Sequence, residues 1–166
     1  MEVLRDMTEV LDREGQFTIH KMETSDIIPL SKALCDMDKR EILLLGENAL
    51  DAMRHSFLLG GYVARNGDCP VATFGVNRNS SPAAIWFLGT SDRFSYPKTF
   101  QTLSKRWVRF LCDDLICGNI VPSDHAQTIK WLESLDFIVD STPYNIEGHD
   151  FFSFVRYGPE SNSLPH

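Results

Sequence analysis

Two segments that follow one another along the chain constrain the fold most. Residues 84–92 (AIWFLGTSD) are an apolar run that opens into a polar loop, and a basic segment of helical periodicity follows. Residues 123–137 (SDHAQTIKWLESLDF) have an amphipathic pattern that stops at an aromatic residue. The first pattern predicts a strand, a polar loop of the kind that binds anions, and a helix. The second predicts another helix, whose apolar side chains are buried along one face.

The remaining periodicities complete a mixed sheet. Asn66 and Gly67 mark a hairpin, because both central positions of such a turn need a positive φ, and Asp124 with Gln127 predicts a capped helix start. Strands are expected at 16–21, 62–65, 69–76, 84–88, 119–121, 138–141 and 151–157, and helices at 27–37, 40–45, 47–58, 95–111 and 124–135. This order predicts an α/β (α+β) fold in which helices cover both faces of a mixed central sheet.

Length and charge limit the classes of protein that fit. The chain of 166 residues fits one domain, expected at 16–157, with an N-terminal arm or helix at 1–15 and a flexible tail at 158–166. A net charge of −7 excludes a general nucleic-acid binder. Membrane spans, secretory signals and cysteines at zinc spacing are missing from the sequence, so a cytoplasmic protein without a metal site is expected.

The charge is uneven along the chain. Residues 93–109 hold five basic side chains and no acidic one. One interpretation is a solvated helix face, and the other is a binding site for a polyanionic ligand at this helix.

Residues 20–34 (HKMETSDIIPLSKAL) and 125–137 (HAQTIKWLESLDF) resemble the first strand and helix, and the late helix, of the GCN5-related N-acetyltransferase (GNAT) superfamily. A narrower resemblance rests on DMDKREILLLG, CPVATFGV, IWFLGTSD and IKWLESLDF, in this order. These segments look like a phage-encoded GNAT-like branch that includes a short internal virion protein of podoviruses and predicted phage acetyltransferases. The resemblance implies acetyl transfer to a host protein or a small amine in the host cytoplasm, with virion association as the alternative.

The resemblance also implies a site for acetyl-CoA. In the family the pantetheine arm bonds between two splayed strands, and the pyrophosphate sits on N–H groups at the start of the following helix. The residues implied here are Phe87, Leu88, Gly89, Thr90, Ser91, Asp92, Arg93 and Lys98, with His125 and Trp131 from the late helix.

The sequence departs from the family's cofactor loop, Arg-x-x-Gly-x-Gly. With Arg93 on the family's Arg, the bulky Tyr96 and Lys98 fall on the two glycines, where side chains would hold phosphates away from the backbone. The phosphates are expected either to bind differently, with Arg93, Lys98 and Lys105 as charge partners, or not to bind. Leu132 falls on the position of the family's Tyr general acid and cannot donate a proton.

A general base must take a proton from the acceptor amine. The candidates are the carboxylates of Asp36, Asp38 and Glu41, at the segment that in the family often forms the acceptor side. Asp38 and Glu41 are the leading pair, and a solvated charge cluster is the alternative. Ser91, close to the predicted site, is a third catalytic candidate, with helix capping as its alternative.

Three functions remain open from the sequence. The first is an acyl-CoA-dependent N-acetyltransferase. The second is a GNAT-fold protein without catalysis that binds a host protein, and the third is a structural or internal virion component. The retained strand, loop and basic helix favour the first, whereas the altered loop and the missing Tyr favour the other two. The oligomeric state stays open.

Overall fold

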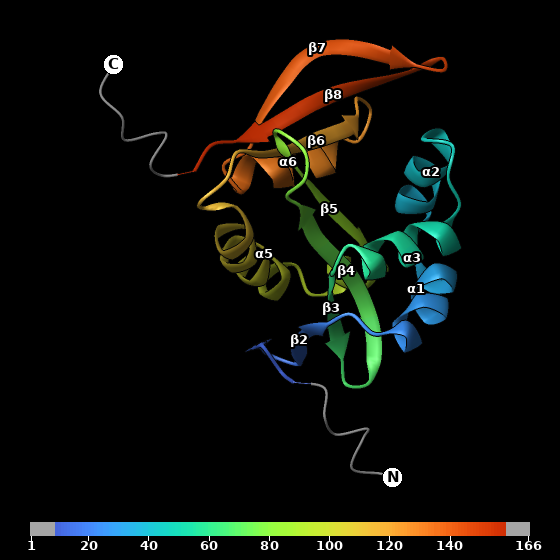
Figure 1. Ribbon diagram of the computed structural model, residues 1–166, viewed down its shortest axis with the longest axis vertical. Coiled ribbons are helices and arrows are strands. Elements are labelled where there is room, and N and C mark those ends of the chain that lie inside the picture. The colour runs from blue at the N-terminus through green and yellow to red at the C-terminus, as the bar shows by residue number, and fades with distance from the viewer. Residues whose placement is uncertain (1–8, 159–166) are drawn as a thin grey trace. The chain divides into compact units, whose positions relative to one another are not determined.

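Eight strands form one mixed sheet within residues 9–158, the part of the chain that the computed structural model describes (Figure 1). Their order across the sheet is β1-β2-β3-β4-β5-β6-β8-β7, and β5 pairs with β6 in parallel. The strands are β1 (Asp12–Glu14), β2 (Phe17–Lys21), β3 (Tyr62–Asn66), β4 (Cys69–Asn77), β5 (Ala83–Gly89), β6 (Cys117–Pro122), β7 (Ile138–Ile146) and β8 (His149–Arg156).

Helices alternate with these strands, as the sequence predicts. They are η2 (Thr24–Asp26, a 3₁₀ helix), α1 (Ile27–Ala33), α2 (Asp36–Leu44), α3 (Ala49–Leu58), α4 (Asp92–Ser95), α5 (Pro97–Cys112) and α6 (Ala126–Ser134). The predicted mixed α/β fold is confirmed.

The chain divides into two compact units. The described part of the first covers residues 9–75 and 87–102, and that of the second covers 76–86 and 103–158. Each unit has its own apolar interior, so the two are described separately below.

In the first unit, β5 has helices on both of its faces. Leu88 packs into a cluster that includes Leu30 of α1, Met53 of α3 and Val63 of β3. The preceding Phe87 contacts Phe100 of α5, with ring centroids 5.3 Å apart. Successive strand residues point to opposite faces, so Leu88 and Phe87 contact helices on the two faces of β5, as predicted.

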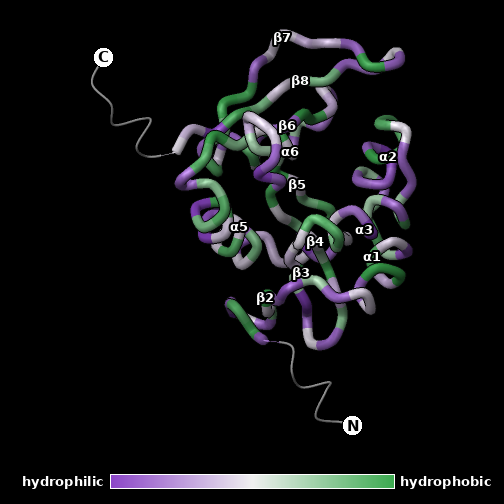
Figure 2. The backbone as a smooth tube through the Cα atoms, viewed as in Figure 1, coloured by the Kyte–Doolittle hydropathy of each residue, from purple (hydrophilic) through white to green (hydrophobic). Residues whose placement is uncertain are grey.

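In the second unit, β6 lies at the centre of the pairing between β5 and β8. Phe151 of β8 is fully buried, and Phe154 meets Phe137 edge to face at 5.2 Å between ring centroids. A Cβ added at Gly118 of β6 would lie 2.4 Å from the Phe154 carbonyl oxygen, so only glycine allows this close approach. Figure 2 shows α5 with hydrophilic and hydrophobic residues interleaved along its length, as an amphipathic helix requires.

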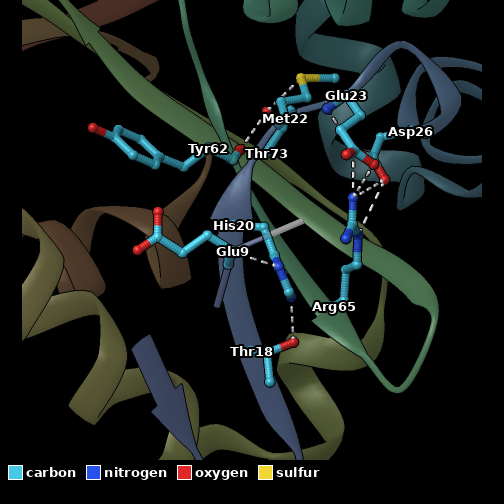
Figure 3. Close-up of polar contacts among 9 residues, drawn as sticks. All are labelled: Glu9, Thr18, His20, Met22, Glu23, Asp26, Tyr62, Arg65 and Thr73. Atoms are coloured by element: carbon cyan, nitrogen blue, oxygen red, sulfur yellow. Dashed lines mark hydrogen bonds and ion pairs between the residues drawn. The ribbon is translucent and has the colours of Figure 1, made fainter. Parts of the chain in front are cut away.

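An ordered arm precedes β2. Asp12–Glu14 pairs with β2 as β1, so these three residues form a strand and not the helix alternative. The His20 ring, buried in β2, bonds the Glu9 carbonyl oxygen through Nδ1 (3.1 Å) and Thr18 Oγ1 through Nε2 (2.7 Å) (Figure 3). Burial, and then the charge of Arg65, lower the pKa of His20. The rest of the predicted arm, 1–8, and of the predicted tail, 159–166, lies outside the described residues.

A buried ion pair fixes β3 to η2. The Arg65 guanidinium donates to both carboxylate oxygens of Asp26, at 3.0 and 3.1 Å from Nη2, and reaches Glu23 at 3.2 Å (Figure 3). Asp26 is 4% exposed and Glu23 46%. Asp26 also accepts the Glu23 N–H at 2.8 Å. Thr24, Ser25 and Asp26 are residues typical of helix caps, whereas in the structure Asp26 is the centre of this network.

Several local predictions need correction. The hairpin turn is Gly67 and Asp68, because Asn66 already pairs with Cys69; only the first central residue, Gly67, has a positive φ, as in a type II′ turn. Asp124 is not the N-cap of α6, because a turn from Pro122 to His125 precedes the helix and His125 takes the N-cap position, where its side chain makes no capping bond.

The other corrections concern element lengths. Residues 142–150 are expected from the sequence to be a connection between two strands. In the structure β7 extends to Ile146, and Glu147 and Gly148 form the turn to β8. The pairing of β7 with β8 is irregular between Asp140 and Tyr144.

The helices predicted at 27–37 and 40–45 are α1, which ends at Ala33, and α2, which runs unbroken from Asp36 to Leu44. The helix predicted at 95–111 is confirmed as α5, which Pro97 opens at a position that needs no N–H, and the short α4 precedes it.

Neutralising Asp26 should destabilise the protein far more than neutralising Glu23. Asp26→Asn leaves the nearly buried Arg65 without its charge partner and should lower the free energy of unfolding by roughly 3 kcal/mol. Glu23→Gln removes an exposed partner and should cost at most about 1 kcal/mol. Urea denaturation of both variants checks this, and equal losses would contradict the dominant role of Asp26.

Candidate functional site

The start of α2 is joined to the end of β5 through Gly89. The Gly89 N–H donates to Asp38 Oδ2 at 2.8 Å, and the Gly89 carbonyl accepts the Cys35 N–H at 2.9 Å. Both backbone groups of Gly89 are therefore used by the first residues of α2. A Cβ at Gly89 would lie 3.1 Å from the Phe87 ring and 3.2 Å from the Val71 carbonyl oxygen, so the site is also tightly packed.

Arg93 completes this junction. Its guanidinium pairs with both oxygens of Asp38, Nη2 with Oδ1 at 3.3 Å and Nη1 with Oδ2 at 3.4 Å. The side chains of Arg93 and Asp38 are 12% and 6% exposed. The guanidinium carbon also lies over the rings of Phe94 and Phe87, 4.8 and 5.2 Å from their centroids, which adds cation–π attraction in a desolvated place.

Glu41 lies one helical turn after Asp38, on the same face of α2. Burial, and then the negative charge of Asp38, raise the pKa of Glu41 to about 7, while Arg93 opposes the rise. A carboxyl group that titrates near neutral pH can take a proton from an ammonium or amine and release it again. The predicted pair of Asp38 and Glu41 is thus brought together, with different environments for its two members.

Cys35 contacts the same cluster without being activated by it. Its Sγ accepts from Arg93 Nη2 at 3.6 Å. Burial, and then Asp38, raise the pKa of the Cys35 thiol, so the reactive thiolate is disfavoured. The sequence gives no signal for this contact, since Cys35 reads as a small buried hydrophobe.

Three backbone amides of the segment after β5 already have acceptors. The Thr90 N–H donates to the Val71 carbonyl at 2.9 Å, the Asp92 N–H to Thr90 Oγ1 at 3.3 Å, and the Phe94 N–H to the Ser91 carbonyl at 3.0 Å. Ser91 is exposed at the start of α4 and has no capping bond from its side chain. Within residues 9–158, the structure gives Ser91 no side-chain bond to Asp38 or Glu41.

The other predicted cofactor residues lie in different surroundings. Leu88 is in the apolar cluster of the first unit, and Lys98 is exposed in the first turn of α5. His125 is buried at the start of α6 and Trp131 is half-buried within it, both in the second unit. Whether these residues contact a cofactor stays a prediction.

The parallel ladder between β5 and β6 is short. It has the pairs Ala83 with Cys117 and Ala84 with Gly118. At the next residue, the Ile85 carbonyl accepts from the side-chain amide of Asn119 at 2.8 Å. β5 nevertheless continues to Gly89, as a strand must if it is to offer backbone groups to a ligand beyond the ladder.

Solved structures of acetyltransferases share this fold. A GNAT-family acetyltransferase from Bacillus anthracis matches with a TM-score of 0.64 and 8% identity, over 87% of this chain and 96% of that one. The ribosomal-protein-S18-alanine N-acetyltransferase of Escherichia coli matches with 0.63 and 12%, over 90% and 99%. Salmonella typhimurium yncA, solved with its cofactor acetyl-CoA, matches with 0.57 and 14%, over 92% and 99%.

The chain has the GNAT acetyltransferase fold. At these identities the likeness shows the fold alone, and neither a protein-family model nor a curated protein matches the sequence. The GNAT-like fold expected from the sequence is therefore confirmed. In the part of the chain that the structure describes, no helix is long and apolar enough to cross a membrane.

The pKa of Glu41 should respond to its two charged neighbours in opposite directions. Asp38→Asn removes a negative charge and should lower the pKa of Glu41 from about 7, while Arg93→Gln should raise it. Carbon-detected NMR titration of the Glu41 carboxyl checks both. Asp36→Asn, at an exposed acid of the same helix, is the matched control and should leave the pKa of Glu41 unchanged.

The same shift makes stability depend on pH. Folded Glu41 holds its proton up to about 7, whereas the unfolded carboxyl releases it near its ordinary 4.5. The folded state therefore binds more protons between these values, and stability falls as pH rises through this window. Glu41→Gln should remove that part of the slope, and an unchanged slope would contradict the assignment.

Proposed function

We propose that this chain is an N-acetyltransferase that moves an acetyl group from the thioester of acetyl-CoA to an amine, with Glu41 as the general base. The observation that carries the proposal is the cluster of Asp38, Glu41 and Arg93 joined to the end of β5, within the fold of known acetyltransferases. The acceptor is a protein or small-molecule amine. The E. coli neighbour, whose substrate is a ribosomal-protein alanine, supports the protein alternative.

The donor fits this chain in part. The end of β5, beyond its short ladder with β6, fits the thioester arm, because the backbone there is extended and its last residue, Gly89, is bonded to Asp38, one helical turn before the base. The segment from Gly89 to Pro97 does not fit the diphosphate in the family's manner, because four of its amides already have acceptors and Arg93 is paired with Asp38. No step below depends on the diphosphate.

Glu41 acts on the acceptor. As a carboxylate it takes the proton that the attacking nitrogen must lose, and its pKa of about 7 lets both protonation states exist at neutral pH. Acetyl-CoA, when bound, supplies the thioester, whose C–S bond breaks as the N–C bond forms. Asp38 and Arg93 hold α2 against β5 and thereby keep Glu41 in place. Leu132 is buried and cannot protonate the departing thiolate, which leaves as the anion or takes a proton from water.

The resemblance to a phage-encoded branch extends the proposal to a host protein as acceptor, in the host cytoplasm. The second candidate is a GNAT-fold protein that binds a host protein without catalysis, or a virion component. The engaged segment after β5 favours this candidate. Activity and its dependence on Glu41 separate the two.

Acetylation should depend on Glu41. The wild-type protein with acetyl-CoA is assayed on a panel of amines, spermidine and peptides with N-terminal alanine among them, by mass spectrometry of the products. Glu41→Gln should lower kcat by about 10²- to 10⁴-fold, and the wild-type rate should rise with pH through about 7 as Glu41 ionises.

Asp36→Asn is the matched control, because Asp36 is an exposed acid on the same helix, and its kcat should equal that of the wild type. Full activity of Glu41→Gln would place the base elsewhere. No product with any amine would favour the non-catalytic candidate.

A further inference from the structure

We propose that this site recognises its acyl donor through the pantetheine thioester arm and takes little binding energy from the nucleotide diphosphate of coenzyme A. Acyl-pantetheine thioesters that lack the nucleotide would then bind as well as acyl-CoA. This inference rests on the proposed function and narrows its donor class.

Recognition of a diphosphate at the end of a strand normally needs free N–H groups at the start of the next helix. Two helices follow β5, and the first is α4. The Asp92 N–H donates to Thr90 Oγ1 and the Phe94 N–H to the Ser91 carbonyl. With four residues, α4 also has almost no dipole to offer. An anion at these two amides would have to break bonds that the chain makes with itself.

The start of α5 is contacted on one side by the N-terminal part of the chain, while Pro97 and Lys98 remain exposed. Its first residue is Pro97, which has no N–H to donate. The Tyr96 ring just before it packs edge to face on the buried Phe17 of β2, with ring centroids 5.4 Å apart. Thr99 Cγ2 lies 3.6 Å from where a Cβ of Gly15 would be, so the turn between β1 and β2 stands against the first turn of α5.

Arg93, the strongest candidate for a phosphate partner in the sequence, is held elsewhere. It makes a two-pronged ion pair with Asp38 and stacks on Phe87 and Phe94. Moving it to a phosphate would leave Asp38, which is 6% exposed, as a buried charge without its cation. Such a loss is strongly unfavourable, so the structure favours Arg93 staying with Asp38.

The thioester arm keeps a place to bind. β5 extends past its two-pair ladder with β6, and its last residue, Gly89, is bonded to Asp38, one helical turn before Glu41. The protein can therefore recognise the donor mainly through its pantetheine thioester end. The charges on α5 remain as a solvated face, which was the first of the two interpretations of the basic segment.

The test is isothermal titration of the wild-type protein with coenzyme A, with pantetheine and with the isolated nucleotide part of coenzyme A. The proposal predicts dissociation constants for coenzyme A and pantetheine within about tenfold of each other, and no heat from the nucleotide part. A site that used two charge-assisted hydrogen bonds to the diphosphate would favour coenzyme A by about 100-fold or more.

The outcomes separate this inference from the function on which it rests. Coenzyme A binding more than about tenfold tighter than pantetheine would overturn the inference and leave the acetyltransferase proposal standing. No binding of either would overturn both. A parallel comparison of kcat/KM for S-acetylpantetheine and acetyl-CoA should give the same ratio as the titrations, because the two donors carry the same reacting group.

Discussion

The hydrogen bond from the Gly89 N–H to the Asp38 carboxylate is the constraint on which the candidate site depends. It joins a helix to a strand 51 residues away in sequence, at 2.8 Å and out of contact with water. Because the carboxylate is buried, it needs a cation, and Arg93 supplies one from the segment just after the same strand. The bond therefore determines three things together: where α2 begins, where Arg93 points and where Glu41 lies.

In this arrangement, groups that could bind a cofactor instead hold the helix that carries Glu41. The Arg93 side chain and the Gly89 amide, which the GNAT resemblance assigns to the cofactor, are used to hold α2 in place. In return, Glu41 lies beside a fixed negative charge in a partly buried place, and its pKa rises to about 7. Under the proposed function, the loss of Arg93 as a phosphate partner and the raised pKa of Glu41 both follow from this one cluster.

The sequence predicts the elements well and their junctions poorly. Apolar periodicity locates β5, α5 and α6, because burial of an amphipathic face is a local pattern. The spacing of Asp38 and Glu41 suits one face of a helix or loop, and the single helix α2 that holds both replaces the break expected between 37 and 40. The partner of Asp38 is not visible, because a contact between α2 and Gly89 depends on tertiary packing. Asp26 shows the same limit, since a helix cap and a buried ion-pair partner have the same local sequence.

Whether Asp38 holds Gly89 can be measured by amide hydrogen exchange in NMR. The Gly89 amide should be protected in the wild type and should lose its protection in Asp38→Ala, which removes the acceptor. The Thr90 amide, bonded to the Val71 carbonyl, should stay protected in both proteins and thereby report that the variant is folded. Rapid exchange at Gly89 in the wild type, or unchanged protection in the variant, would contradict the account.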